Sequence, residues 1–304
     1  MSNIRYVKRH SIDEQKWNKL ITNSVNSLPY AFSWYLDSIA TWDAFILNDY
    51  EAVMPLVWMR KFGIKCLYQP YYCQQLGVFA KRDLTAANTM EFISLTTRQF
   101  PYVNINLNPS AAVIANAFDF TGKKNLLLDL NRDYEMISSG YSESHSRNIS
   151  KAVKKGVTFS ENVQLKPFQK FYIENVDRNK EVFKPKHAKI FKALTSKLLL
   201  ENKAKIFAAV DSDENLLGAV LLIIHGNRLV AIINTSSAAG KQSGASPFVF
   251  DQIIRKYAGT NKVLDFEGSS IPGIARFYEG FGAHEEGFYN YKHTLIKSLA
   301  RRFK

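Results

Sequence analysis

The alternation of apolar and polar positions predicts secondary structure most clearly in the second half of the chain. Apolar residues at helical spacing indicate helices from Pro167 to Arg178 and from Lys186 to Leu200. The near-continuous apolar run Leu216 to Ile224 is typical of a strand buried on both faces. Further strands are predicted at Thr158 to Ser160, Lys205 to Val210, Leu229 to Asn234, Val263 to Phe266 and Gly287 to Leu295, with helices from Pro247 to Tyr257 and after Pro272. The expected order is β-α-α-β-β-β-α-β-α-β.

The first half repeats this order with less clarity. We expect strands at Ile4 to Lys8, Ala44 to Leu47, Ala52 to Arg60 and Val103 to Leu107, with helices at Ile12 to Thr22, Phe32 to Thr41 and Leu84 to Gln99. A chain of 304 residues has room for two such domains. We place them at residues 1–135 and 136–304, joined near the polar stretch Asn131 to Gly140, which precedes a helix from Glu143 to Lys155.

Polar residues gather after the strand Val263 to Phe266. Its loop carries Glu267, and Pro272 opens a short helix that carries Tyr278. Open sheets in α/β proteins bind ligands beyond the carboxyl ends of their strands, so this edge of the sheet is a candidate site. A partly desolvated carboxylate there can act as a base, which makes Glu267 and Asp265 candidate bases. The alternatives are a structural hydrogen-bonding role for Asp265 and a core-facing ring for Tyr278.

A second candidate site follows the strand Leu229 to Asn234. Ser246 is a suitable N-cap and Pro247 a suitable first helical residue, so free backbone N–H groups and the helix dipole would attract an anion there. Glycine lets a backbone approach a phosphate closely. The residues concerned are Gly240, Lys241, Gln242, Ser243, Gly244, Ala245 and Ser246. The alternative is a loop that only connects a strand to a helix.

These motifs resemble a known superfamily. The stretch DFEGSSIPGIARFYEGFGA, residues 265–283, is similar to the FemAB-like branch of the GNAT acyltransferases. Lys241-x-x-Gly244-x-Ser246 is similar to the GNAT pattern that holds the coenzyme A pyrophosphate, with lysine and serine as departures from it. The resemblance implies an α/β (α+β) fold of tandem GNAT-like domains. Each would have a mixed, largely antiparallel sheet flanked by helices, and the first domain would be degenerate.

The same resemblance implies a reaction. An N-acyltransferase of this kind transfers an acyl group from acyl-coenzyme A, such as acetyl-coenzyme A, to a small-molecule or peptide amine that attacks directly. The donor would lie between the strands Leu229 to Asn234 and Val263 to Phe266, where Tyr278 would serve as the acid and Glu267 or Asp265 would act on the amine. One alternative is an aminoacyl-tRNA donor with a peptidoglycan precursor as acceptor. Another is a binding module without catalysis.

Two further segments resemble FemAB-like proteins. Ser144 to Val157 matches a helix in which Arg147 and Asn148 are candidates for the substrate site, where they would brace the cleft between domains. The alternative for this helix is a solvated amphipathic linker. Tyr68 to Gln75 matches an aromatic segment whose Tyr71, Tyr72 and Gln74 are candidates to line an acceptor cleft, or else form a covering surface loop.

The formal net charge of +13 suits a nucleic acid, an anionic membrane surface or a phosphate-rich ligand. It therefore modestly favours tRNA, although the long basic helical extension of tRNA-using members is missing. The two clusters of basic residues are Arg147, Lys151, Lys154 and Lys155, and Lys297, Arg301, Arg302 and Lys304.

Hydropathy, cysteine content and the absence of metal and nucleophile motifs narrow the range of possible functions further. The sequence has no membrane-spanning run and no signal peptide, so we expect a cytoplasmic protein with at most peripheral membrane contact. Cys66 and Cys73 are expected to be reduced thiols. The six histidines lack metal-ligand spacing, and neither a nucleophile elbow nor a phosphate-binding P-loop is present, so we expect no metal.

Overall fold

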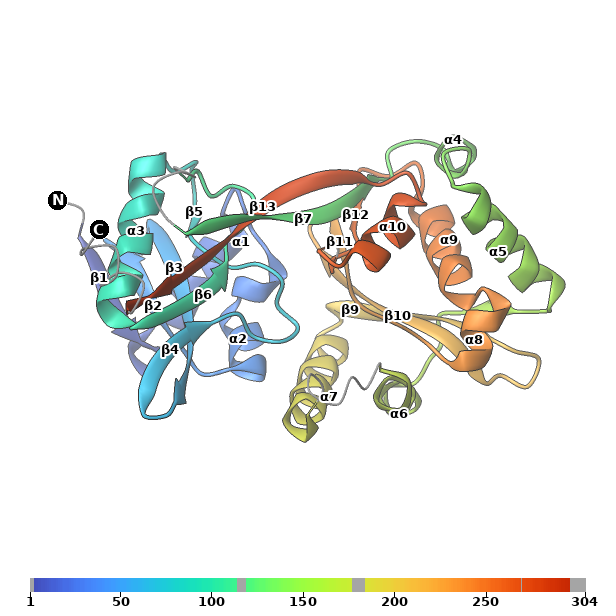
Figure 1. Cartoon of the computed structure of the whole chain (residues 1–304), viewed down its shortest axis with the longest axis horizontal. Coiled ribbons are helices and arrows are strands. Elements are labelled where there is room, and N and C mark those ends of the chain that lie inside the picture. Colours follow the sequence, from blue (N-terminus) through green and yellow to red (C-terminus); the bar gives the residue numbers. More distant parts are fainter. Residues whose placement is uncertain (1–2, 114–118, 177–183, 269, 296–304) are drawn as a thin grey trace. The chain divides into compact units, whose positions relative to one another are not determined.

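The computed structural model describes residues 3–113, 119–176, 184–268 and 270–295. Contacts divide the chain into two compact units, Met1–Lys124 with Gly287–Lys304, and Asn125–Glu286 (Figure 1). The predicted join lies further along, at 131–140, and the end of the chain was expected in the second domain. The difference arises because the last described strand returns to pair within the first unit. The second basic cluster, residues 297–304, lies outside the described residues, as do Arg178 and Ser269.

The first unit contains a sheet in the order β1-β2-β3-β4-β6-β13, with β5 paired to the start of β3. The pairs are antiparallel except β4 with β6. Its strands are β1 (Ile4–Lys8), β2 (Trp42–Leu47), β3 (Ala52–Lys61), β4 (Ile64–Tyr68), β5 (Phe79–Ala80), β6 (Tyr102–Asn106) and β13 (His284–Thr294), which begins in the second unit. Its helices are α1 (Glu14–Thr22), α2 (Ser33–Ile39) and α3 (Ala86–Gln99), with 3-10 turns at Arg9–Ser11 and Pro29–Ala31.

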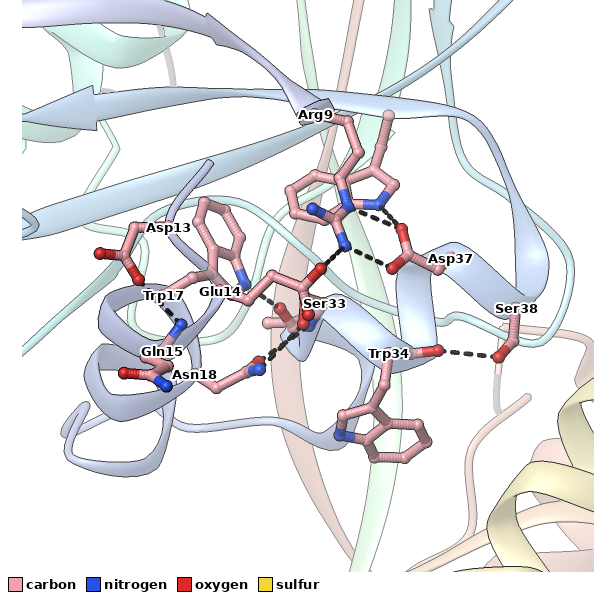
Figure 2. Close-up of polar contacts among 12 residues, drawn as sticks. Arg9, Asp13, Glu14, Gln15, Trp17, Asn18, Ser33, Trp34, Asp37 and Ser38 are labelled. Atoms are coloured by element: carbon pink, nitrogen blue, oxygen red, sulfur yellow. Dashed lines mark hydrogen bonds and ion pairs between the residues drawn. The ribbon is translucent and has the colours of Figure 1, made fainter. Parts of the chain in front are cut away.

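A polar cluster fixes α1 and α2 beside the first strands (Figure 2). Asp13 caps α1 by accepting hydrogen bonds from two backbone N–H groups of its first turn. The Arg9 guanidinium donates to both oxygens of Asp37, at 2.8 and 2.6 Å, and also binds Glu14. The Trp42 indole donates to the same Asp37 carboxylate at 2.8 Å. One carboxylate of α2 thereby orients a guanidinium and an indole, so this cluster is structural.

The second unit contains a sheet in the order β7-β12-β11-β10-β9-β8, in which only β11 and β12 are parallel. Helices α6 and α7 lie on one side of this sheet and α5, α8 and α9 on the other (Figure 1). The strands are β7 (Phe120–Asp129), which begins in the first unit, β8 (Thr158–Ser160), β9 (Ala204–Val210), β10 (Leu216–His225), β11 (Arg228–Ser236) and β12 (Val263–Asp265). The helices are α4 (Tyr134–Ser138), α5 (Glu143–Lys154), α6 (Leu165–Asn175), α7 (Pro185–Leu200), α8 (Ala238–Ser243), α9 (Ala245–Tyr257) and α10 (Pro272–Glu279).

The predicted fold class is confirmed: both sheets are mixed, largely antiparallel and flanked by helices. The expected element order is also found from β8 to β13, with one additional helix, α8, between β11 and α9. Residues 217–223 of β10 are all buried, as a strand covered on both faces requires. The elements that the sequence analysis missed are β4, β5, β7, α4 and α8.

The stretch expected to join two domains is instead packed into the second unit. It forms α4, whose Ile137 is 2 % exposed. The Tyr134 hydroxyl donates to Asp251 of α9 at 2.6 Å, and the Arg132 carbonyl accepts from the Gly259 N–H. A polar sequence therefore does not mark a linker here, because its polar groups are satisfied by α9 and by the segment after it.

Among the described residues, no helix combines the length and apolar character needed to cross a bilayer. Both cysteines are free thiols, with Cys73 buried and Cys66 half-buried.

Candidate active site

The second unit contains a pocket where two parallel strands separate. Pairing between β11 and β12 ends at Val230 and Asp265, whereas β11 continues to Ser236. The register between β10 and β11 also shifts, so that Ile232 is an extra, bulged residue. A pocket of about 850 Å³ opens beside this stretch of β11, and Ile232 is part of its wall. Its other walls come from α5, from α8 and the start of α9, and from α10 with the loop before it.

Seven of the residues predicted for the site line this one pocket: Tyr278, Glu267, Gly240, Lys241, Gly244, Ser246 and Asn148. Gln242, Ser243, Ala245, Arg147 and Asp265 are absent from its described lining. The segment from Gly240 to Ser246 and the segment from Glu267 to Tyr278 therefore meet at one pocket. Both segments follow strands, and ligand sites form beyond strand ends.

Tyr278 lies on α10 and is 5 % exposed. Its ring stacks on Phe266, with ring centroids 4.6 Å apart, and its hydroxyl is hydrogen-bonded to the side chain of Asn234. Burial raises the pKa of Tyr278 to about 12, although the Asn234 hydrogen bond opposes this effect. The phenol is therefore protonated at neutral pH and available as a hydrogen-bond donor at the pocket wall.

Asn234 holds this phenol from the part of β11 that extends beyond its pairing with β12. Ser246 of α9 donates to Asn234 Oδ1 at 3.2 Å, and the Ser246 and Ser236 hydroxyls are 2.6 Å apart. With its oxygen accepting from Ser246, the Asn234 amide N–H is directed to Tyr278. Asn234 was missed in the sequence analysis, and the one signal for it was a polar residue at the end of an apolar strand.

Glu267 lines the pocket from the loop that follows β12. Its φ of 51° is left-handed, and Gly268 after it has a φ of 63°. The Glu267 N–H donates to Asp265 Oδ1 at 3.1 Å. These two successive left-handed residues turn the chain sharply at the pocket rim. A left-handed backbone is uncommon for glutamate. A half-buried carboxylate in this position can accept a proton from a ligand.

Asp265 lies behind the pocket and is 1 % exposed. Its Oδ2 is 3.2 Å from Arg228 Nη1, and its Oδ1 accepts from Asn125 at 3.0 Å. Arg228 also pairs with Glu286 at 2.7 Å. Burial raises the pKa of the Asp265 carboxyl, and the Arg228 guanidinium opposes that shift. This geometry favours the structural alternative, in which Asp265 of β12 binds side chains of β7 and β11 and so holds the three strands together.

The predicted glycine loop is two helices with a single turn residue between them. Gly244 has a φ of 81°, ends α8 and precedes the first residue of α9. Ser246 is consequently inside α9, so the expectation that it is an N-cap and that Pro247 opens the helix was wrong. Periodicity alone did not reveal α8, because it is one short turn of small and polar residues capped by Ser237.

Both glycines of this motif approach protein backbone. A Cβ at Gly240 would lie 1.8 Å from the Leu217 carbonyl oxygen, and one at Gly244 would lie 2.4 Å from the Asn148 carbonyl oxygen. Close packing of α8 on β10 and of α5 on the α8–α9 junction thus accounts for both residues. The packing argument is independent of any ligand, and both glycines also line the pocket.

The pocket carries an excess of positive charge. Lys241 of α8 and Arg276 of α10 are exposed at its wall, and within the described part of the chain neither forms an ion pair. Glu267 is the single carboxylate among the described lining residues. Arg276 was missed in the sequence analysis. Two cations without partners suit an anionic group, such as a phosphate.

His145 of α5 also reaches the pocket, but its ring is buried against α10. Its ring centroid is 4.2 Å from that of Phe281 and 5.0 Å from that of Phe277, and the histidine is 5 % exposed. Burial lowers the pKa of His145, so the imidazole is neutral at pH 7. It adds no charge to the pocket.

The remaining substrate candidates lie elsewhere. Arg147 is exposed on α5. Tyr71, Tyr72 and Gln74 belong to the first unit, whereas the pocket is lined by residues of the second. Tyr71 is 42 % exposed, and the Tyr72 carbonyl accepts a hydrogen bond from the Tyr35 hydroxyl. Their role in binding an acceptor stays a prediction. No cluster of three or more potential metal ligands occurs in the described ranges.

Comparisons with known proteins identify the fold. No protein-family model matches the sequence, and no curated protein matches it. The crystal structure of FemX is similar over 98 % of this chain and 99 % of its own, with a TM-score of 0.64 and 10 % identity. A conserved protein of unknown function from Bacteroides thetaiotaomicron VPI-5482 is similar over 96 % and 99 %, with a TM-score of 0.63 and 8 % identity.

The structure of L-PGS from Bacillus licheniformis is similar over 93 % of this chain and 92 % of its own, with a TM-score of 0.57 and 10 % identity. At such low identity these likenesses speak for the fold alone. The chain therefore has the fold of FemX and L-PGS, in agreement with the predicted FemAB-like fold.

Proposed function

We propose that this protein is an N-acyltransferase that uses acyl-coenzyme A, bound in the pocket of the second unit, to acylate an amine. The observation that carries the proposal is the pocket itself, which opens where β11 separates from β12. It has cations on α8 and α10, a phenol on α10 and a carboxylate in the loop after β12. Acyl transfer from a phosphate-bearing thioester needs both kinds of group.

The cations support an anionic donor. Lys241 and Arg276 are placed to attract phosphate oxygens, and Ser246 brings the first turn of α9, with its favourable helix dipole, to the same wall. Lysine supplies a point charge, while arginine can form two parallel hydrogen bonds. The separated strands leave room for an extended pantetheine arm along β11.

The acid and base roles follow from the places of Tyr278 and Glu267 at the pocket wall. A neutral amine attacks the thioester carbonyl, a C–N bond forms, and the C–S bond breaks. Glu267 takes the proton that the amine loses. The Tyr278 phenol, with a pKa of about 12, is a weak acid, so it donates a hydrogen bond to the departing sulfur. The thiolate, with an ordinary pKa of about 8.5, then takes its proton from solvent.

The second candidate is an aminoacyl-tRNA donor with a peptidoglycan precursor as acceptor. The net charge of +13 favours it, because phosphate contacts dominate the affinity for nucleic acids. A third candidate is a non-catalytic module that binds a ligand in the same pocket.

A thermal-shift titration with coenzyme A and acetyl-coenzyme A, at low and high salt, tests the donor. A ligand that binds only the folded protein raises Tm with the logarithm of its concentration. We expect Lys241→Glu to weaken coenzyme A binding by about tenfold or more through charge reversal. The matched control is Lys189→Glu, an exposed lysine of α7 outside the pocket lining, which should leave binding unchanged.

Each outcome directs the next step. A saturable shift that Lys241→Glu weakens and Lys189→Glu preserves supports the acyl-coenzyme A donor. The absence of any shift in the wild-type protein contradicts that donor. Salt-sensitive binding of aminoacyl-tRNA then supports the second candidate, and its absence leaves the binding module.

A further inference from the structure

The hairpin of β3 and β4 ends in an exposed aromatic residue. Lys61 pairs with Ile64, so Phe62 and Gly63 form a two-residue turn. Phe62 is 92 % exposed and Ile64 is 50 % exposed. The hairpin extends beyond the helices of the first unit (Figure 1). Two large apolar side chains are therefore presented to solvent at one tip.

The conformation of this turn makes phenylalanine an unusual choice. Phe62 has a φ of 50° and Gly63 a φ of 76°. Two-residue hairpins with two positive φ values favour Asn-Gly or Gly-Gly, because a bulky side chain is strained there. The turn itself would thus be better served by asparagine. The aromatic ring at this position calls for a role outside the fold.

The charges around the tip all have one sign. From Ala52 to Arg82 the sequence contains no aspartate or glutamate. Arg60 and Lys61 are exposed beside the turn, and the Lys61 ammonium lies 5.8 Å from the centre of the Phe62 ring. The Arg60 guanidinium donates to the Gly63 carbonyl at 3.1 Å, which keeps this charge at the tip.

Lys65, two positions further along the chain from Gly63, is used differently. Its ammonium binds Asp43 at 2.9 Å and lies 4.0 Å from the centre of the Trp58 ring. This lysine stabilises the inner face of the hairpin. Arg60 pairs with Lys65 and shares its face, but it is held at the tip, where Lys61, Phe62 and Ile64 are also exposed for contacts with a partner.

We propose that this tip docks on an anionic lipid surface. Phe62 and Ile64 insert at the boundary between headgroups and acyl chains, while Arg60 and Lys61 contact lipid phosphates. Apolar insertion and attraction to anionic lipid act together in such contacts. A stable protein interface needs about 800 Å² on each partner, far more than a two-residue turn offers. The inference is independent of the acyl donor.

Co-sedimentation with vesicles tests the proposal. The probes are vesicles of phosphatidylglycerol mixed with phosphatidylcholine, and vesicles of phosphatidylcholine alone. We expect the wild-type protein to bind the anionic vesicles preferentially. Phe62→Ser should weaken this binding about tenfold, because a large apolar side chain no longer inserts. Lys61→Gln should weaken it at low salt and much less at high salt.

The matched control is Leu200→Ser, which removes a side chain that is 82 % exposed at the end of α7. It should bind vesicles like the wild type. Circular dichroism and Tm of both serine variants should equal those of the wild type, because both side chains are exposed. Equal vesicle binding by Phe62→Ser and Leu200→Ser overturns the proposal. So does wild-type binding that shows no preference for anionic vesicles, or no binding to either.

Discussion

Tyr278 and Asn234 are hydrogen-bonded through their side chains at the wall of the pocket, one from α10 and the other from the part of β11 that extends beyond β12. Asn234 in turn accepts a hydrogen bond from Ser246 at 3.2 Å. The phenol that is proposed to assist the leaving group is therefore positioned by a strand and a second helix.

Replacing Tyr278 by phenylalanine removes the hydroxyl and keeps the ring, so it distinguishes the contributions of the two. The stack on Phe266 is kept, so we expect Tm to change little and kcat to fall by about 10². Because the pKa of Tyr278 is about 12, the phenol stays protonated at lower pH, and its ionisation should not reduce wild-type turnover below about pH 11. The release of free thiol, followed against pH, measures both effects. An unchanged kcat would remove Tyr278 from the mechanism.

Asn234→Ala removes the donor that orients the phenol. We expect kcat to fall several-fold, with a smaller change in KM, because the group acts through Tyr278. Asn234→Asp should be at least as harmful, since a carboxylate accepts but cannot donate the hydrogen bond. Asn162→Ala, at an exposed position of the same unit, is the control. If Asn234→Ala raises KM alone, Asn234 contacts substrate instead.

Gly244 and Gly156 offer a matched test of packing. Both have positive φ, 81° and 71°, but a Cβ at Gly156 meets nothing within 4 Å. Gly156→Ala should therefore cost about 1 kcal/mol of unfolding free energy from backbone strain alone. Gly244→Ala should cost about 2 kcal/mol more, because its Cβ would meet the Asn148 carbonyl oxygen. Urea unfolding measures both values, and equal losses would mean that α5 moves to accommodate the methyl group.

Arg228→Met tests the buried carboxylate behind the pocket. Without the guanidinium, Asp265 keeps a buried charge, so we expect a loss of about 3–5 kcal/mol at neutral pH. The loss should shrink as pH falls, because burial raises the pKa of Asp265 and protonation removes the charge. Lys256→Met breaks an exposed pair with Glu161 and should change stability little. A pH-independent loss would contradict this account.

His145 links the stability of the second unit to pH. Its pKa in the folded state is lowered by burial, so the unfolded chain binds a proton at higher pH than the folded protein does. Stability from the neutral ring is present above the unfolded pKa of about 6.5 and declines as pH falls below it. We expect His145→Leu to flatten this decline in urea unfolding between neutral and acidic pH. His225, whose pKa is also lowered by burial, should account for part of the remaining slope.

The pattern of apolar and polar residues predicted many of the helices and strands of the second unit. The run Leu216 to Ile224 matches β10 within one residue, and the spacing of apolar residues predicted α7 and α9 within two residues at each end. These elements have a strong period, because a whole face of each is buried in the sheet or against it. β7 was missed because its first half, with Gly122, Lys123 and Lys124, reads as a polar loop.

Some residues of the candidate site could be predicted from the sequence and others could not. A carboxylate just beyond a buried strand can be recognised locally, which predicted Glu267, and the resemblance to GNAT motifs implied Tyr278 and Lys241; all three line one pocket. Arg276 could not be predicted in this way, and Asn234, although a polar residue at the end of an apolar strand, gains its place from contacts between elements distant in the chain. The burial of Asp265 beside Arg228 is likewise a property of strand order, which no local pattern contains.

The sequence by itself determined the fold class and the strand end beside which the pocket opens, because burial periodicity and turn residues act over short distances. Only the tertiary structure decided why Gly240 and Gly244 are glycine, which carboxylate is braced, and where the units divide. Those features depend on which backbones approach one another and on the return of β13 to the first sheet. They are set by packing between segments far apart in the chain.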